Sequence, residues 1–325
     1  MRCSKCKGQA VIELRRHHSA FCKPDYLEFF DHQVERAIRR QCMFTPEDRV
    51  MVGVSGGKDS LTLWDYLLRM GYNVTALHIH LGIGDYSDTS CQKATSFAGE
   101  RGASLITIDL AESYGMGISE LSQSLRRVPC SGCGLSKRYV LNKEAYERGF
   151  TVVAMGHNLD DEAATLMGNI LHWQVGSLAR QSPSLPTNGD KLVKRVKPLY
   201  TMTEREVAAN ALLRGIDYVE EECPNAVGAR SILYKNALDQ IEAQSPGTKY
   251  NFVAGFLERV RALMDEAQEE FELRDCAICG QSTTSEVCAF CRMWQQAHQK
   301  AQEQQDRHKA RKVSQERAAE QVATD

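Results

Sequence analysis

Residues 49–68 read RVMVGVSGGKDSLTLWDYLL, and this stretch decides the fold of the chain. The apolar run from Arg49 to Ser55 predicts a buried strand, and the apolar positions after the glycines recur at helical spacing. A glycine-rich loop between a strand and a helix presents backbone N–H groups at the helix N-terminus, where they can hold phosphate oxygens. The candidate nucleotide loop is therefore Ser55-Gly56-Gly57-Lys58-Asp59-Ser60.

Strands and helices continue to alternate after this unit. Three further apolar runs predict strands, namely NVTALHIHL (73–81), ASLITIDL (103–110) and FTVVAMG (150–156). Helical patterns lie between and after them, over Thr89–Arg101, Leu135–Glu147 and 159–170. This alternation predicts an α/β fold with a doubly wound parallel sheet over roughly residues 45–222.

Length and composition exclude several classes of protein. The chain has 325 residues, of which 42% are hydrophobic and 25% charged, as expected for about two globular domains. No run approaches the ~18 apolar residues of a membrane span and no signal peptide is evident, so we expect a cytoplasmic protein without a membrane partner. Because the net charge is −2, a nucleic acid would have to bind a local basic patch. The candidate basic residues are Arg15, Arg16, Arg36, Arg39, Arg40, Arg126, Arg127, Lys191, Lys194, Arg195 and Lys197.

Ten of the twelve cysteines fall into three clusters, and Cys42 and Cys91 are left over as ordinary thiols. In a reducing compartment, clustered cysteines indicate metal sites or redox chemistry rather than disulfides. The first cluster, Cys3, Cys6 and Cys22, supplies three metal ligands and needs a fourth. The last cluster has paired CxxC spacing and predicts a closed tetrahedral zinc site. Its members are Cys276, Cys279, Cys288 and Cys291.

The middle cluster consists of Cys130, Cys133 and the distant Cys223. Three thiolates cannot close a tetrahedral site, whereas a [4Fe-4S] cluster with three cysteine ligands leaves one iron open for an external ligand that can carry sulfur. The alternative is a structural zinc pair or a redox dithiol at the CxxC, with Cys223 as a small buried apolar residue.

The candidate loop is not a Walker A loop, because Val52 stands six places before Lys58 and Asp59 follows that lysine. A second motif, GHNLDD at residues 156–161, follows a predicted strand, and by itself it could simply cap a helix through Asn158 or Asp160. Together the two motifs resemble those of the PP-loop ATP pyrophosphatase superfamily, which cleaves ATP between the α and β phosphates and transfers AMP to a substrate oxygen.

Three more segments extend this resemblance to all but the last thirty or so residues: CSGCGLSKRY (130–139), EECPNA (221–226) and CAFCRMW (288–294). The chain resembles the TtcA/TtuA family of cluster-dependent tRNA thiolation enzymes, and in particular its TtuA group. The resemblance implies an ATP-dependent tRNA sulfurtransferase that makes the 2-thio form of 5-methyluridine in the thymine loop. It also implies a second partner, a ubiquitin-like sulfur carrier with a C-terminal thiocarboxylate. It does not decide whether the protein forms a homodimer.

The resemblance also assigns roles to residues. Cys130, Cys133 and Cys223 would ligate the [4Fe-4S] cluster, while Lys137 and Asp161 would act at ATP and uridine. Residues that would contact ATP are Gly53, Val54, Ser55, Gly56, Gly57, Lys58, Asp59, Ser60, Ile79, Lys137, Gly156 and Asp161, with Mg²⁺ near Asp59.

Two zinc ions would occupy the terminal cysteine clusters. The family has a Cys-x2-His half-site at the N-terminal end, whereas this chain has Asp25 at the histidine position. Asp25 is favoured by position as the fourth ligand; ligation by His17 or His18, or weaker zinc binding, are the alternatives.

The expected reaction starts with attack of the uridine C2 oxygen on the α-phosphate of ATP. Lys137 would steady the developing negative charge and Asp161 would orient the base or the metal, after which sulfide held on the open iron replaces AMP. The rival hypotheses are a wobble-uridine or cytidine thiolase, a cluster-free thiolase with Cys130 and Cys223 as persulfide and nucleophile, a PP-loop amide or lysidine ligase, and a non-catalytic zinc-finger RNA-binding module.

These assignments predict five regions along the chain. They are an N-terminal zinc finger (1–30), a PP-loop catalytic domain (31–225), a helical extension (226–272) with helices over Ser231–Gln244 and Tyr250–Glu270, a C-terminal zinc finger (273–294), and a polar tail (295–325) that is a frayed helix or disordered.

Overall fold

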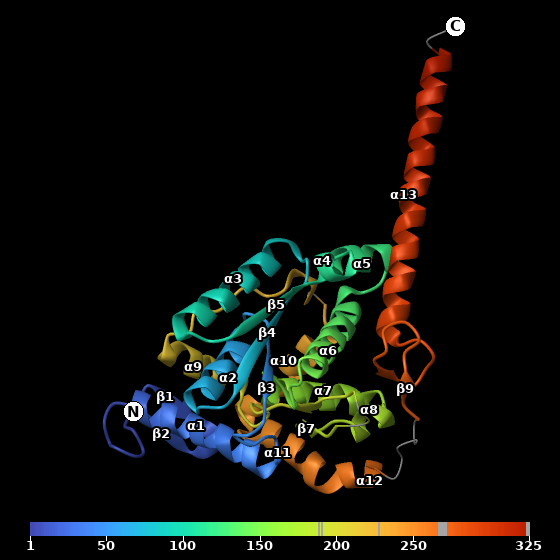
Figure 1. Cartoon of the computed structure of the whole chain (residues 1–325). Helices are drawn as coiled ribbons and strands as arrows, with labels where there is room; N and C mark the ends of the chain where they lie inside the picture. The colour runs from blue at the N-terminus through green and yellow to red at the C-terminus, as the bar shows by residue number, and fades with distance from the viewer. Residues whose placement is uncertain (188, 190, 227, 266–271, 323–325) are drawn as a thin grey trace.

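The computed structural model describes residues 1–187, 189, 191–226, 228–265 and 272–322 (Figure 1). Its central sheet has the strand order β5-β4-β3-β6-β8-β7, and every neighbouring pair is parallel except β7 and β8. The predicted α/β fold with a mainly parallel sheet is confirmed. The strands are β3 (Val50–Val54), β4 (Val74–His80), β5 (Leu105–Asp109), β6 (Val152–Met155), β7 (Ser184–Leu185) and β8 (Lys194–Val196).

The inner strands are continuous apolar runs because helices cover both faces of the sheet. Successive residues of β3 point to opposite faces, so that Val50 and Val52 join one core and Met51 joins the other. The helices of the first core are α1 (Lys23–Arg40), α2 (Lys58–Arg69), α3 (Gly84–Arg101) and α9 (Glu204–Arg214). Those of the second are α4 (Leu110–Tyr114), α5 (Ile118–Leu125), α6 (Pro129–Glu147) and the start of α13.

A third apolar core joins the helical extension to α7 (Leu159–Leu171) and α8 (Val175–Ala179). The helix predicted over Tyr250–Glu270 is present as one continuous helical stretch from Thr248 to Asp265, in which the middle turn is π-helical; residues 266–270 lie outside the described part. The extension consists of α10 (Arg230–Gln244), α11 (Thr248–Gly255), the π-helical turn (Phe256–Val260) and α12 (Arg261–Asp265). Its packing on α7 brings residues from beyond the sheet close to the second motif.

Two helices begin earlier than the sequence pattern predicts. Helix α3 starts at Gly84 rather than Thr89, and α6 starts at Pro129 rather than Leu135. Proline is accepted in the first turn of a helix because its missing N–H would have no partner there. The small residues that follow Pro129 give no apolar pattern at helical spacing. At Gly132 the packing favours glycine, since a Cβ there would lie 2.8 Å from the side chain of Leu121.

Small modules lie at both ends of the chain. The N-terminal one contains the antiparallel hairpin β1 (Ile12–Leu14) and β2 (Ser19–Phe21) with a 3-10 turn (Arg15–His17) between them; the C-terminal one contains β9 (Arg274–Asp275) and β10 (Ser282–Thr283). A further 3-10 turn is Pro224–Ala226.

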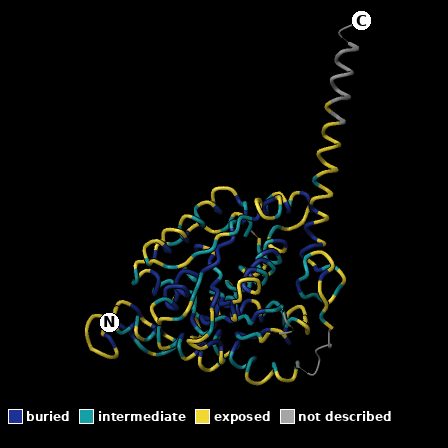
Figure 2. Tube along the Cα trace, in the orientation of Figure 1, coloured by how far each residue is buried: buried dark blue, intermediate teal, exposed yellow. Residues whose placement is uncertain are grey.

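The polar tail belongs to the long helix α13 (Ala289–Val322), which projects away from the body (Figure 1). Its projecting part is largely exposed as far as burial is described (Figure 2). Of the two predicted states of the tail, the helical one is present up to Val322.

Among the described helices, none combines the length and the apolar character needed to span a lipid bilayer.

Candidate active site

A cavity of about 280 Å³ opens at the carboxyl ends of β3, β4 and β6. This is the edge at which parallel α/β sheets bind their ligands. The predicted site residues that line it are Gly53, Val54, Ser55, Asp59, Ser60, Ile79, Cys133, Lys137, Gly156, Asp161 and Cys223, whereas Gly56, Gly57, Lys58 and Cys130 do not. The two motifs and two of the three middle cysteines, far apart in sequence, thus meet at one cavity.

The glycine-rich loop is held in shape by its own serines. The Ser60 hydroxyl donates to the Gly57 carbonyl at 3.0 Å and accepts from the Ser55 backbone N–H at 3.1 Å. Gly56 has a φ of +78°, and a Cβ there would lie 2.6 Å from the Ser90 carbonyl oxygen. The loop therefore requires glycine at this position.

The second motif packs directly against the loop. A Cβ on Gly156 would lie 2.9 Å from the backbone of Asp59 and Ser60, so only glycine permits this approach. The Asn158 side chain accepts from the Asp161 N–H, and the Asp161 carboxylate accepts from the Asn158 N–H, both at 3.1 Å. This is a capping box at the start of α7. Asn158 also donates to the Asp59 carboxylate at 3.1 Å, so the cap links the two motifs.

Two residues that the sequence analysis missed complete an ionic network beside this cap. Glu204, at the start of α9, accepts from Lys58 at 2.8 Å and from Lys235 of α10 at 3.2 Å. Lys235 also contacts Asp161 at 2.6 Å. Burial lowers the pKa of Lys235, but the carboxylates of Asp161 and Glu204 more than offset it and raise that pKa above the ordinary lysine value. No motif marks either residue, because both reach the site only through packing of later helices.

The cavity wall carries buried polar atoms that have no partner within the described structure. They are His78 Nε2, Ser90 Oγ and His157 Nδ1. Burial lowers the pKa of both histidines, so each imidazole is neutral and offers one donor and one acceptor nitrogen. Buried polar groups normally have hydrogen-bond partners, so these atoms fit a polar ligand such as a nucleotide.

The middle cysteines meet at the mouth of the cavity. Cys130 and Cys133 lie in the first two turns of α6, and the Cys130 thiol donates to the Asn225 carbonyl, two residues after Cys223, at 3.2 Å. Burial raises the pKa of Cys133, and the nearby Lys137 opposes this shift. Lys137 follows one helical turn after Cys133, and both side chains line the cavity.

The ligand atoms of the N-terminal cluster Cys3, Cys6, Cys22 and Asp25 all lie within 4.8 Å of one another. The Asp25 carboxylate accepts from the thiols of Cys3 and Cys22 at 2.9 and 3.1 Å, and these hydrogen bonds lower its pKa to about 2. Thiolates 2.3 Å from a tetrahedral zinc are about 3.8 Å apart, which matches the 3.6 Å between the Cys6 and Cys22 sulfurs. His17 and His18 are not part of this group as described.

The C-terminal cluster has the same compact geometry, with all four sulfurs within 4.8 Å of one another and 3.8 Å between those of Cys279 and Cys288. Aromatic residues attach it to α6. The rings of Phe290 and Tyr139 stack with centroids 3.7 Å apart, and Trp294 Nε1 donates to the buried Ser136 hydroxyl at 3.3 Å. Ser136 adjoins Lys137, so the C-terminal module supports the helix that carries the CxxC and this lysine.

Most of the candidate basic residues have partners within the chain. Arg16 pairs with Glu206, Lys191 with Asp275 and Lys197 with Glu162. Arg36, Arg126 and Arg127 are exposed and have no carboxylate partner among the described residues. Arg126 and Arg127 stand immediately before the CxxC helix, so free positive charge is available beside the mouth of the cavity.

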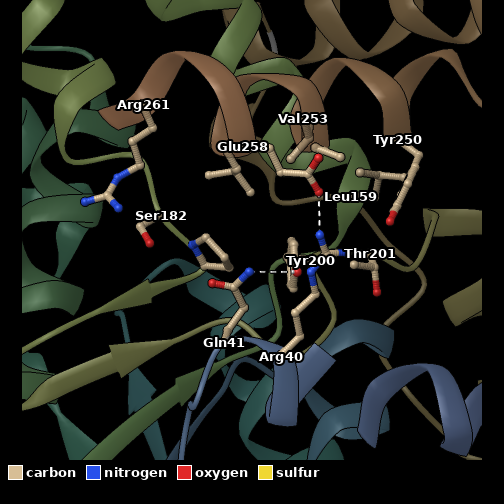
Figure 3. A pocket seen from close by; sticks show the side chains of 13 residues that line it. Arg40, Gln41, Leu159, Ser182, Tyr200, Thr201, Tyr250, Val253, Glu258 and Arg261 are labelled. Atoms are coloured by element: carbon tan, nitrogen blue, oxygen red, sulfur yellow. Dashed lines mark hydrogen bonds and ion pairs between the residues drawn. The ribbon is translucent and has the colours of Figure 1, made fainter. Parts of the chain in front are cut away.

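A second cavity, of about 190 Å³, lies between the end of α1 and the π-helical turn (Figure 3). The Arg40–Glu258 ion pair spans it, and Gln41 donates to the Tyr200 hydroxyl at 3.2 Å (Figure 3). None of the predicted site residues lines it. It is separate from the candidate active site.

Two family models match the chain. The PP-loop domain model matches residues 30–229, and the model of the N-terminal LIM domain of the 2-thiouridine synthetase TtuA matches residues 2–27. The first match alone covers more than half of the chain.

Curated relatives and a solved structure align over nearly the whole chain. A Thermus thermophilus protein named tRNA-5-methyluridine(54) 2-sulfurtransferase is 53% identical over 93% of each chain. A protein of the same name from Pyrococcus horikoshii is 44% identical over 90% of this chain and 94% of its own. The structure of the U34-tRNA thiolase NcsA from Methanococcus maripaludis with its [4Fe-4S] cluster is 29% identical, with a TM-score of 0.77 over 90% of this chain and 95% of that one.

Proposed function

The chain belongs to the PP-loop family of TtuA-type 2-thiouridine synthetases, and we propose that it is an ATP-dependent sulfurtransferase that thiolates C2 of 5-methyluridine in the thymine loop of tRNA. The observation that carries this proposal is the single cavity in which the nucleotide loop meets Lys137, Asp161, Cys133 and Cys223. The choice of 5-methyluridine over wobble uridine rests on identity, which is 53% to the T. thermophilus relative and 29% to the U34 thiolase.

ATP would lie with its phosphates at the N-terminus of α2, where the loop N–H groups and the positive end of the helix dipole favour negative charge. The uridine C2 oxygen would attack the α-phosphate, the bond to the β-phosphate would break, and pyrophosphate would leave. Lys137 would stabilise the negative charge that develops at the α-phosphate. This step converts a poor leaving oxygen into an adenylate that departs as AMP.

Three cysteines fit a [4Fe-4S] cluster better than a single ion. The sulfurs of Cys130, Cys133 and Cys223 do not form one of the compact ligand groups present at the two ends of the described chain, as expected for ligands that are spaced around four irons. When bound, the cluster would supply the sulfur that replaces the adenylated oxygen. Cys133 and Cys223 are half-buried and Cys130 is exposed, so the cluster would lie at the surface end of the cavity.

The side chains at the site and in the terminal clusters also indicate which metal ions the protein would bind. Asp59 and Asp161 offer carboxylate oxygens, which Mg²⁺ prefers, and the two compact clusters fit Zn²⁺ with Asp25 as the fourth N-terminal ligand. Arg126 and Arg127 would contact tRNA phosphates beside the cavity, and a thiocarboxylated ubiquitin-like carrier would deliver sulfur there. The reaction would take place in the cytoplasm, where tRNA is found.

The test of this proposal is the thionucleoside content of cellular tRNA. Deletion of the gene should remove 2-thio-5-methyluridine from digested bulk tRNA, as measured by mass spectrometry, and expression of the intact chain should restore it. Loss of a wobble 2-thiouridine instead would show that the enzyme acts on wobble uridine and not on 5-methyluridine. An unchanged thionucleoside profile would reject thiolation.

A Cys276→Ser and Cys279→Ser double variant should lose one zinc ion per chain, because half of the C-terminal ligands are removed. We expect α13 and the start of α6 to exchange amide hydrogens faster, since the Phe290 and Trp294 contacts depend on this module. Zinc analysis and hydrogen exchange measure both effects, with Cys91→Ser as the control. Unchanged exchange in a variant that lacks this zinc would contradict its structural role.

A further inference from the structure

Lys235 lies outside the PP-loop family match, which ends at residue 229, and α10 of the helical extension places it at the edge of the active site, in contact with Asp161. Tyr234 packs against Gly168 of α7, where a Cβ would lie 2.9 Å from its ring. This close contact sets the position of α10 on α7. The neighbouring Lys235 consequently reaches Asp161, at the beginning of α7, with 2.6 Å between ammonium and carboxylate.

Three carboxylates lie at the phosphate end of the cavity. Asp59 and Asp161 line it, and Glu204 lies next to them. An ATP molecule, whose triphosphate carries several negative charges, therefore needs nearby cations in order to bind.

Two lysines at this end of the cavity form ion pairs with the same carboxylate, that of Glu204. The Glu204 carboxylate holds both Lys58, from the loop, and Lys235, from the extension, at 2.8 and 3.2 Å. Glu204 is itself fixed, because its backbone N–H donates to Asp160 at 2.8 Å. A lysine side chain has four rotatable bonds and a compact charge, so either ammonium can turn from a carboxylate to a phosphate without movement of its helix.

We propose that Lys235 is a phosphate-binding residue of the nucleotide site, supplied by the helical extension and held ready beside Asp161 and Glu204. It contacts the β- or γ-phosphate of ATP, and it makes no contact with AMP. This assignment rests on the proposed ATP-dependent function and adds a binding residue to it. The extension is therefore part of the nucleotide site as well as a structural support for α7.

The test compares nucleotide affinities of the full-length protein, purified anaerobically with its cluster, in the absence of tRNA. Lys235→Gln removes the charge and keeps a polar side chain that is one bond shorter. By isothermal titration calorimetry, ATP should bind it about 10- to 100-fold more weakly than the parent protein, the usual effect of losing one charge-assisted hydrogen bond. AMP affinity should change by less than about threefold, and Lys235→Arg should recover most of the ATP affinity.

Lys93→Gln is the matched control. Lys93 is also ion-paired, with Asp217, and its side chain is 28% exposed compared with 26% for Lys235. Equal weakening of ATP and AMP binding by Lys235→Gln would show that Lys235 only supports Asp161 and would overturn the inference. Unchanged ATP affinity would also overturn it. Absence of ATP binding by the parent protein would instead refute the proposed function.

Discussion

Replacement of Cys133 by alanine should abolish both the iron–sulfur cluster and tRNA thiolation, although Cys133 is not one of the two cysteines that a persulfide mechanism would use. A [4Fe-4S] cluster held by three cysteines has no spare ligand, so loss of any one should release the iron. Cys130→Ala and Cys223→Ala should have the same effect. Iron and sulfide content, visible absorbance and thiolation of tRNA after anaerobic purification measure it.

Cys133→Ala separates the two mechanisms because the persulfide pair would be Cys130 and Cys223. A Cys133→Ala protein without iron that still thiolates tRNA would reject the cluster and support the persulfide mechanism. Cys42→Ala is the control, since Cys42 is exposed and does not line the cavity. It should keep full iron content and activity.

Asp161→Asn and Lys137→Ala should each slow adenylate formation by about 10²- to 10³-fold, the usual effect of removing one group that stabilises transition-state charge. Asparagine at position 161 can still accept the Asn158 N–H, so the cap of α7 should remain and the loss should report the missing charge. AMP and pyrophosphate release in the presence of tRNA measures the step. The iron content should stay at the level of the parent protein, because neither residue is proposed as a ligand.

The control for Lys137→Ala lies on the same helix. Lys143 also belongs to α6, but it pairs with Glu147 at 2.7 Å and does not line the cavity. Lys143→Ala should therefore leave AMP release unchanged. Release of AMP at the parent rate by Lys137→Ala would remove this lysine from the mechanism, and ADP as the stoichiometric product would exclude adenylation.

Features that depend on local chemistry could be predicted from the sequence. The strand and helix around Ser55–Ser60 follow from hydrophobic period and glycine, and the cysteines of each terminal cluster are predicted by their spacing within one short segment. Asp25 is favoured only by its position in the family pattern. The start of α6 was missed because Pro129 to Gly134 has no apolar period. The two short strands β7 and β8 also gave no separate signal.

The sequence by itself determined the class of fold, the nucleotide loop, the capping motif and the two terminal groups of cysteines, because each depends on residues that are neighbours along the chain. Only the tertiary structure decided which of these groups meet. The parallel sheet brings the loop and the cap together at one edge, and the close approach at Gly156 depends on strands that are about a hundred residues apart. Glu204 and Lys235 carry no motif, and they reach Lys58 and Asp161 only because α9 and α10 pack beside the sheet. Long-range packing determines such contacts, and no local period or spacing encodes them.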